Sequence, residues 1–180
     1  DVMAAVAQAL RAHQAPKVVL DTVMVAKSGD RLMPDDAVAF FKEELLPLAD
    51  VITPNLPEAS VLLGREVRAT ANMHEAAREL WDMCGGKTAV YLKGGHSAEE
   101  TLRDVFYDGK AFIDLDGPRV HTKNTHGTGC SLSSAIAALW ARTDDLPQAV
   151  RLARRYIEEA INASDDLLAL LEVQSVYTMG

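Results

Sequence analysis

The chain has 180 residues, 48% of them hydrophobic and 24% charged, and a formal net charge of -8 at pH 7. This is the composition of an ordinary globular domain, and no run of about 18 or more apolar residues predicts a membrane-spanning helix. Because the negative chain has no cluster of lysines and arginines, nucleic acid is a poor candidate partner.

The two cysteines, Cys84 and Cys130, lie far apart and show no metal-ligand spacing. They predict neither a disulfide framework nor a zinc site, and they favour a reducing, cytoplasmic setting. The chain starts without Met, and Val2, Met3 and Val6 already recur at helical spacing. We therefore expect that an N-terminal segment is missing.

The first half of the chain alternates between helices and short apolar strands. The opening helix is broken at Pro16, and residues 17–21 read as a buried parallel strand. A helix follows from Pro34 to about Leu46, with proline and acids in its first turn. Residues 50–53 form the next strand.

A rigid turn with two prolines, residues 54–58, then leads into a helix that ends near Gly64. The pattern predicts another helix over residues 73–83 and a strand over residues 88–93, which a glycine pair terminates. Short alternating segments around Asp108-Gly109 predict an antiparallel hairpin.

A glycine loop precedes a helix over about residues 130–140, and residues 146–171 predict one or two more amphipathic helices. Together these elements indicate a single α/β domain over residues 1–180, with a mainly parallel sheet covered by helices on both faces. In such sheets ligands bind at the carboxyl ends of the strands. Four polar residues fall at or just past such ends: Asp21, Asn55, Glu58 and Lys93.

The strongest functional signal is Gly127-Thr128-Gly129-Cys130 at the start of a helix. Glycines let backbone N–H groups approach an anion, which a helix N-terminus favours electrostatically. The alternative is a glycine turn that only starts a helix. In the first turn the helix dipole would lower the pKa of Cys130, so that its sulfur could accept a proton, although a small buried residue is equally consistent. Cys84 is expected to be buried and inert.

Asn55 and Glu58 are an oxygen pair suited to Mg²⁺, directly or through water, but they also fit a helix cap. Lys93 could reach a phosphate or be a solvated lysine at a strand end. Asp21 could orient metal-bound water or cap a turn. Three histidines lack ligand spacing and are expected to line or flank loops: His96, His121 and His126.

Four ordered segments closely resemble the bacterial hydroxymethylpyrimidine/phosphomethylpyrimidine kinases of thiamine biosynthesis, members of the ribokinase-like superfamily. They are Val19-Leu20-Asp21-Thr22-Val23-Met24, Ile52-Thr53-Pro54-Asn55-Leu56-Pro57-Glu58-Ala59, Lys93-Gly94-Gly95-His96 and Thr122-Lys123-Asn124-Thr125-His126-Gly127-Thr128-Gly129-Cys130. The resemblance covers about residues 17 to 162. Most other ribokinase-like enzymes carry Asp where this loop has Cys130. The resemblance implies the ribokinase-like three-layer sandwich.

The resemblance also implies ATP-dependent phosphorylation of 4-amino-5-hydroxymethyl-2-methylpyrimidine at its hydroxymethyl group, and then of the monophosphate, at one site. The family's roles fall on matching positions: Gly127, Thr128 and Gly129 at the phosphates, Cys130 near the acceptor, Asn55 and Glu58 toward Mg-ATP, Lys93 toward the phosphates, Asp21 near the metal, and Val23 and Met24 in the pyrimidine pocket. ATP and Mg²⁺ are thus the implied cofactors, and a homodimer is compatible with the resemblance.

The family normally begins with a strand and a Gly-Ser-Asp-rich segment that carries much of the pyrimidine pocket. The chain resembles only the C-terminal two-thirds of such an enzyme, so its acceptor pocket is expected to be incomplete. Two other functions stay open: a pyridoxal-kinase-like vitamin kinase, and a non-catalytic module that binds the precursor.

Overall fold

The computed structural model describes residues 2–25, 32–68, 72–95, 101–120 and 127–163. The chain forms two compact units, residues 1–118 and residues 119–180. Within the described ranges, no helix combines the length and the apolar character needed to cross a membrane.

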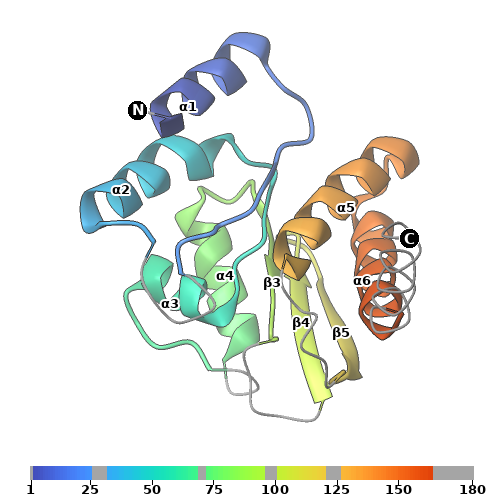
Figure 1. Ribbon diagram of the computed structural model, residues 1–180. Coiled ribbons are helices and arrows are strands. Elements are labelled where there is room, and N and C mark those ends of the chain that lie inside the picture. The colour runs from blue at the N-terminus through green and yellow to red at the C-terminus, as the bar shows by residue number, and fades with distance from the viewer. Residues whose placement is uncertain (1, 26–31, 69–71, 96–100, 121–126, 164–180) are drawn as a thin grey trace, which may run out of the picture. The chain divides into compact units, whose positions relative to one another are not determined.

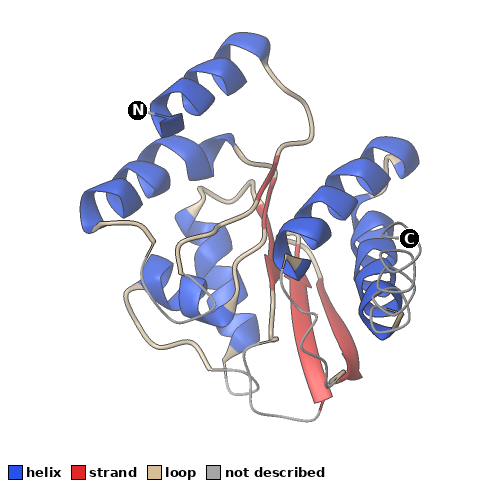
Figure 2. Cartoon of the chain, in the orientation of Figure 1, coloured by secondary structure: helices blue, strands red, loops and turns tan. Residues whose placement is uncertain are grey.

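The first unit is built on a five-stranded sheet with the strand order β1-β2-β3-β4-β5 (Figures 1 and 2). The strands are β1 (Val19–Leu20), β2 (Val51–Ile52), β3 (Ala89–Leu92), β4 (Thr101–Tyr107) and β5 (Phe112–Pro118). β1, β2 and β3 run parallel, whereas β4 and β5 are each antiparallel to the strand before them. The predicted α/β fold is confirmed, and the predicted hairpin makes its sheet a mixed one.

The described part of this unit contains four α-helices: α1 (Val2–His13), α2 (Asp35–Phe40), α3 (Leu56–Leu63) and α4 (Met73–Met83). Each coincides with a predicted helix. α2 continues through a π-helical turn (Phe41–Leu45) and a 3-10 turn (Leu46–Leu48). The helix stops here, close to its predicted end, because Pro47 has no N–H with which to continue the hydrogen-bond ladder.

The central strands are buried on both faces. Ile52, Val90 and Leu92 belong to a core that α3 and α4 share, and all three are fully buried. Val51 and Tyr91, whose side chains alternate to the other face, are also fully buried. Burial on both sides explains why these strands read as continuous apolar runs in the sequence.

The β4–β5 hairpin turns at Asp108-Gly109, as predicted. The Asp108 carboxylate accepts hydrogen bonds from the N–H groups of Lys110 and Ala111, both at 2.9 Å. Gly109 adopts φ of 85°, and a Cβ at this residue would lie 2.6 Å from the Trp81 ring. The turn therefore needs glycine both for its left-handed backbone and for the space that Trp81 occupies.

The second unit consists, in its described part, of α5 (Thr128–Thr143) and α6 (Leu146–Asn162), which pack against each other. α6 begins where the Asp145 side chain accepts a hydrogen bond from the N–H of Gln148 at 3.0 Å. One helix is thus found where one or two were predicted, and residues 164–180 lie outside the described part of the chain.

Candidate active site

Three residues that follow the parallel strands meet at one edge of the sheet. Asp21, Thr53 and Lys93 come directly after β1, β2 and β3. Asp21 Oδ1 accepts a hydrogen bond from Thr53 Oγ1 at 2.9 Å and lies 3.2 Å from Lys93 Nζ. The side chains of Asp21 and Lys93 are only 16% and 15% exposed, so solvent screens this ion pair weakly. Such an edge is where α/β sheets bind ligands.

Asn55 and Glu58 form a reciprocal capping box at the start of α3. Asn55 Oδ1 accepts from the Glu58 N–H at 2.8 Å, and Glu58 Oε2 accepts from the Asn55 N–H at 2.9 Å. Glu58 Oε2 also accepts from Thr22 Oγ1 at 3.1 Å. The capping role is therefore present, and a ligand-binding role would have to coexist with it through the second Glu58 oxygen, to which no described residue donates.

The Glu58 carboxyl group is buried, with an exposed fraction of 2%. Burial raises its pKa above the usual 4.5, because a charged carboxylate loses hydration there. The positive charge of Lys93 and the hydrogen bonds from Asn55 and Thr22 act in the opposite direction, while the negative charge of Asp21 adds to the rise. A cation placed beside Asp21 and Glu58 would favour the charged form of the Glu58 carboxyl group.

This raised pKa predicts how stability changes with pH. Above the usual glutamate pKa of 4.5 the unfolded chain loses a proton that the folded chain still holds at Glu58. Folding stability due to this group therefore falls as the pH rises from the usual pKa through the raised one. Glu58→Gln keeps an acceptor for the Asn55 N–H and removes the titration. We expect the parent chain to lose stability relative to Glu58→Gln between about pH 4 and pH 7.

Urea unfolding of both chains at the two pH values measures this difference. Glu79→Gln is a matched control, because the pKa of Glu79 is lowered by its hydrogen bond from Arg65. The parent should gain stability relative to Glu79→Gln over the same pH interval. A parent chain that behaved alike against both variants would contradict the raised pKa of Glu58.

The predicted magnesium ligands fit the ion only in part. Among the described residues, no group of three or more His, Cys, Asp and Glu side chains is arranged to hold a metal. Asn55 Oδ1 is engaged in the α3 cap, whereas Asp21 and Glu58 each keep one oxygen that accepts no hydrogen bond from a described residue. Mg²⁺ often binds through one or two carboxylates, several waters and the substrate phosphates. Asp21 and Glu58 fit this mode, in which water and substrate supply most of the ligands. They do not fit a site in which protein side chains supply all of the ligands.

The two residues assigned to the pyrimidine pocket differ in burial. Val23 is 41% exposed, whereas Met24 is 1% exposed and belongs to the hydrophobic core. The Met24 side chain is therefore engaged in packing within the first unit. Of this pair, only Val23 presents a side chain that a ligand could contact directly.

The anion site predicted around residues 127–129 coincides with the start of α5. Gly127 is the N-cap residue with φ of 76°, a left-handed conformation that favours glycine. The first backbone hydrogen bond of the helix runs from the Ser131 N–H to the Gly127 carbonyl at 2.9 Å. The N–H groups of Thr128, Gly129 and Cys130 precede it, so the helix itself offers them no acceptor. The preceding motif residues 124–126, and all three histidines considered above, lie outside the described residues.

The two cysteines occupy opposite environments. Cys130 is exposed in the first turn of α5, whereas Cys84 is buried after α4, where burial raises the pKa of its thiol to about 11. The expectation for Cys84 is confirmed. The alternative that Cys130 is a small buried residue is not what the structure shows, because Cys130 is exposed in the first turn of α5.

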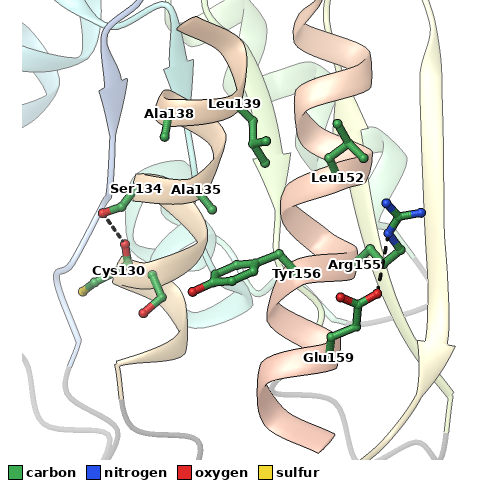
Figure 3. Close-up of a pocket in the computed structure, with 10 residues that line it drawn as sticks. Cys130, Ser134, Ala135, Ala138, Leu139, Leu152, Arg155, Tyr156 and Glu159 are labelled. Atoms are coloured by element: carbon green, nitrogen blue, oxygen red, sulfur yellow. Dashed lines mark hydrogen bonds and ion pairs between the residues drawn. The ribbon is translucent and has the colours of Figure 1, made fainter. Parts of the chain in front are cut away.

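A groove of about 730 Å³ runs between α5 and α6 within the second unit (Figure 3). The Tyr156 ring extends from α6 toward α5, and Arg155 pairs with Glu159 at 3.7 Å along the rim. On α5 the Ser134 hydroxyl donates to the Cys130 carbonyl at 2.8 Å. The first turn of α5 therefore opens on a surface with room for a small molecule.

The sequence pattern did not indicate the buried hydroxyl groups that hold the carboxylates. Thr22 and Thr53, both fully buried, donate to Glu58 and Asp21 respectively. Asp104, a buried acid inside β4, was also missed. For Asp104 a signal was available in the sequence, namely a polar residue at an inward-facing position of an apolar strand, since buried polar groups need partners.

Comparisons with known proteins identify the family. The family model described as phosphomethylpyrimidine kinase matches residues 1–171. The chain belongs to the phosphomethylpyrimidine kinase family. It is 45% identical over 168 residues to the hydroxymethylpyrimidine/phosphomethylpyrimidine kinase of Rhizobium meliloti, a match that covers 93% of the chain and 62% of that relative. The chain thus spans less than two thirds of the length of this relative.

Solved structures of two enzyme types share the fold. A phosphomethylpyrimidine kinase from Clostridium difficile has a TM-score of 0.75 and 31% identity, over 89% of this chain and 64% of that one. A pyridoxal kinase from Bacillus subtilis, solved as an ADP complex, has a TM-score of 0.80 and 34% identity, over 89% of this chain and 60% of that one. This family membership accounts for the resemblance seen in the sequence.

Proposed function

We propose that the protein containing this chain is a kinase of thiamine biosynthesis. It would transfer the γ-phosphoryl group of ATP to the hydroxymethyl group of 4-amino-5-hydroxymethyl-2-methylpyrimidine, and then phosphorylate the monophosphate. The observation that carries this proposal is the 45% identity to a hydroxymethylpyrimidine/phosphomethylpyrimidine kinase over 93% of the chain. The exposed Cys130 in the glycine loop of α5 supports it.

In the first step the acceptor is an alcohol, which must lose a proton as its oxygen attacks the γ-phosphorus. Cys130 Sγ accepts that proton in our proposal, and the bond from the γ-phosphorus to its bridging oxygen breaks to release ADP. A thiolate is favoured at this position because the helix N-terminus stabilises negative charge. The N–H groups of Thr128 and Gly129 hold the phosphoryl oxygens, which carry the charge of the transition state.

The second step makes a different demand, because its acceptor is a phosphate monoester. Its second pKa is about 6, so the attacking oxygen is largely ionised near neutral pH. Cys130 then has little or no proton to remove. We therefore expect the first step to depend more strongly on the Cys130 thiol than the second step does.

On the nucleotide side, the Lys93 ammonium is assigned to the phosphates and is held in place by Asp21 at 3.2 Å. Asp21 and Glu58 would hold Mg²⁺ through water with their remaining oxygens. When bound, the metal neutralises charge on the β- and γ-phosphates. The known ADP complex of the B. subtilis pyridoxal kinase supports nucleotide binding by this fold.

Pyridoxal kinase is the second candidate, because solved pyridoxal kinases share the fold with a TM-score of up to 0.80. Both acceptors are ring alcohols, so turnover of the full-length gene product with each decides between them. We expect higher kcat/KM for the pyrimidine alcohol, with ADP formed in step with product. Preference for pyridoxal would overturn our choice, and tight pyrimidine binding without ATP consumption would favour a precursor-binding module.

A further inference from the structure

The main chain at the end of β3 is held from both sides. The Lys93 N–H donates to the Pro54 carbonyl at 2.8 Å, which forms a parallel bridge next to the α3 cap. The next N–H, that of Gly94, donates to Asp104 Oδ1 at 2.8 Å. The main chain at Lys93 is thus held by two acceptors. One is the carbonyl group of Pro54, and the other is the side chain of Asp104.

Strand geometry explains why a carboxylate takes the Gly94 N–H. The last β3–β4 pair is Leu92 with Val105, so two residues further on Gly94 faces Arg103. A Cβ at Gly94 would lie 1.8 Å from the Arg103 carbonyl oxygen, which shows how closely the two strands approach there. The regular ladder ends at this point, and the Asp104 side chain supplies the acceptor.

Asp104 is well placed for this task. It is 8% exposed, and its other oxygen accepts from the hydroxyl of the fully buried Tyr91 at 2.8 Å. Hydrogen bonds to a charged acceptor are about twice as strong as neutral ones. By the same register Asp104 stands opposite Lys93, on the same face of the sheet. The Lys93 ammonium nevertheless pairs with Asp21, so Asp104 contacts the main chain next to the lysine.

We propose that Asp104 is a positioning residue for Lys93. By anchoring the Gly94 N–H, its carboxylate fixes the direction in which Lys93 leaves β3 and so aims the ammonium group at the phosphates. This inference rests on the proposed function, in which Lys93 contacts the nucleotide. It adds a residue that acts through Lys93 and touches no substrate itself.

The test is a double-mutant cycle in the full-length gene product, read as kcat/KM for ATP. We expect Asp104→Ala to lower this value about tenfold, the effect of losing one hydrogen bond to a charged group. In the Lys93→Met background, Asp104→Ala should lower kcat/KM by less than about twofold, because the ammonium group that Asp104 positions is then absent. A tenfold loss in both backgrounds would overturn the proposal, since it would indicate a general structural role.

Asp104→Asn keeps an acceptor for the Gly94 N–H and should stay within about threefold of the parent. Asp116→Asn is a matched control, because Asp116 pairs with Arg103 on the exposed side of the same hairpin, and it should leave kcat/KM unchanged. If Asp104→Ala does not fold, Asp104→Asn decides: a large loss with the Gly94 amide still protected from hydrogen exchange would contradict positioning.

Amide exchange separates this inference from the proposed function. In the parent and in Asp104→Asn the Gly94 amide should be protected, and in Asp104→Ala it should exchange faster, whatever the protein phosphorylates. An unprotected Gly94 amide in the parent would contradict the role of Asp104 and would leave the proposed function unaffected. Absence of any ATP-dependent phosphorylation in a parent with a protected Gly94 amide would defeat the proposed function instead.

Discussion

Cys130→Ala should abolish most phosphorylation of the pyrimidine alcohol while sparing the fold. Loss of a general base costs about a hundredfold or more in rate, because the attacking hydroxyl then keeps its proton. Cys130 is exposed at the start of α5, so its truncation leaves no cavity in a core. The measurement is single-turnover kinetics of each step in the full-length gene product, with circular dichroism to check the fold.

The second step is the internal control for this variant. Its acceptor is already ionised, with a second pKa of about 6, so we expect a loss of less than about threefold. Cys84→Ala is the matched cysteine control, because Cys84 is buried after α4 and should affect stability and not the first step. Cys130→Asp, which restores a proton acceptor, should recover part of the first step. Unchanged alcohol phosphorylation in Cys130→Ala would refute the proton-acceptor role.

Gly129→Asp should remove both phosphorylation steps. Gly129 lies in the first turn of α5, after Gly127 and before Cys130, where N–H groups have no acceptor within the helix. A carboxylate there would occupy the place of the phosphoryl oxygens and repel them. Loss of a preorganised anion site typically costs about two to three orders of magnitude in rate. Turnover with either acceptor, together with ATP binding by calorimetry, measures the effect.

Gly129→Ala is the matched control, since it adds bulk at the same Cα without charge. Gly129 is not among the described glycines with positive φ, so alanine does not strain its backbone. We expect Gly129→Ala to bind ATP better than Gly129→Asp and to keep more activity in both steps. Equal activity of the two variants would show that no anion occupies the start of α5, and the anion-hole proposal would then be wrong.

Much of the fold could be predicted because its signals are local. The strand cores 19–20, 51–52 and 89–92, the helix 73–83 and the hairpin at Asp108-Gly109 follow from apolar periodicity and turn residues. The mixed character of the sheet was harder to anticipate. Alternation of strands and helices describes the first three strands well, but the position of the hairpin at the β3 edge depends on contacts between distant residues.

The candidate site shows the same division. That Cys130 lies in the first turn of a helix was readable from the glycine loop, but its exposure and the burial of Cys84 needed the structure. Met24 is buried whereas its neighbour Val23 is exposed. Only the packing of the first unit decides which of these two adjacent side chains faces a core. Asn55 and Glu58 had two readings in the sequence, and the structure shows the helix cap.

By itself the sequence determined the family, the α/β class and the residues that could carry phosphoryl-transfer chemistry, because each motif lies within one short segment. Only the tertiary structure decided which of those residues meet. Asp21 and Lys93 are 72 positions apart and pair because two parallel strands end at the same edge. Asp104 holds the Gly94 N–H because β3 and β4 approach too closely for a side chain at Gly94. Neither contact is encoded in local periodicity, since both depend on how strands pair across the sheet.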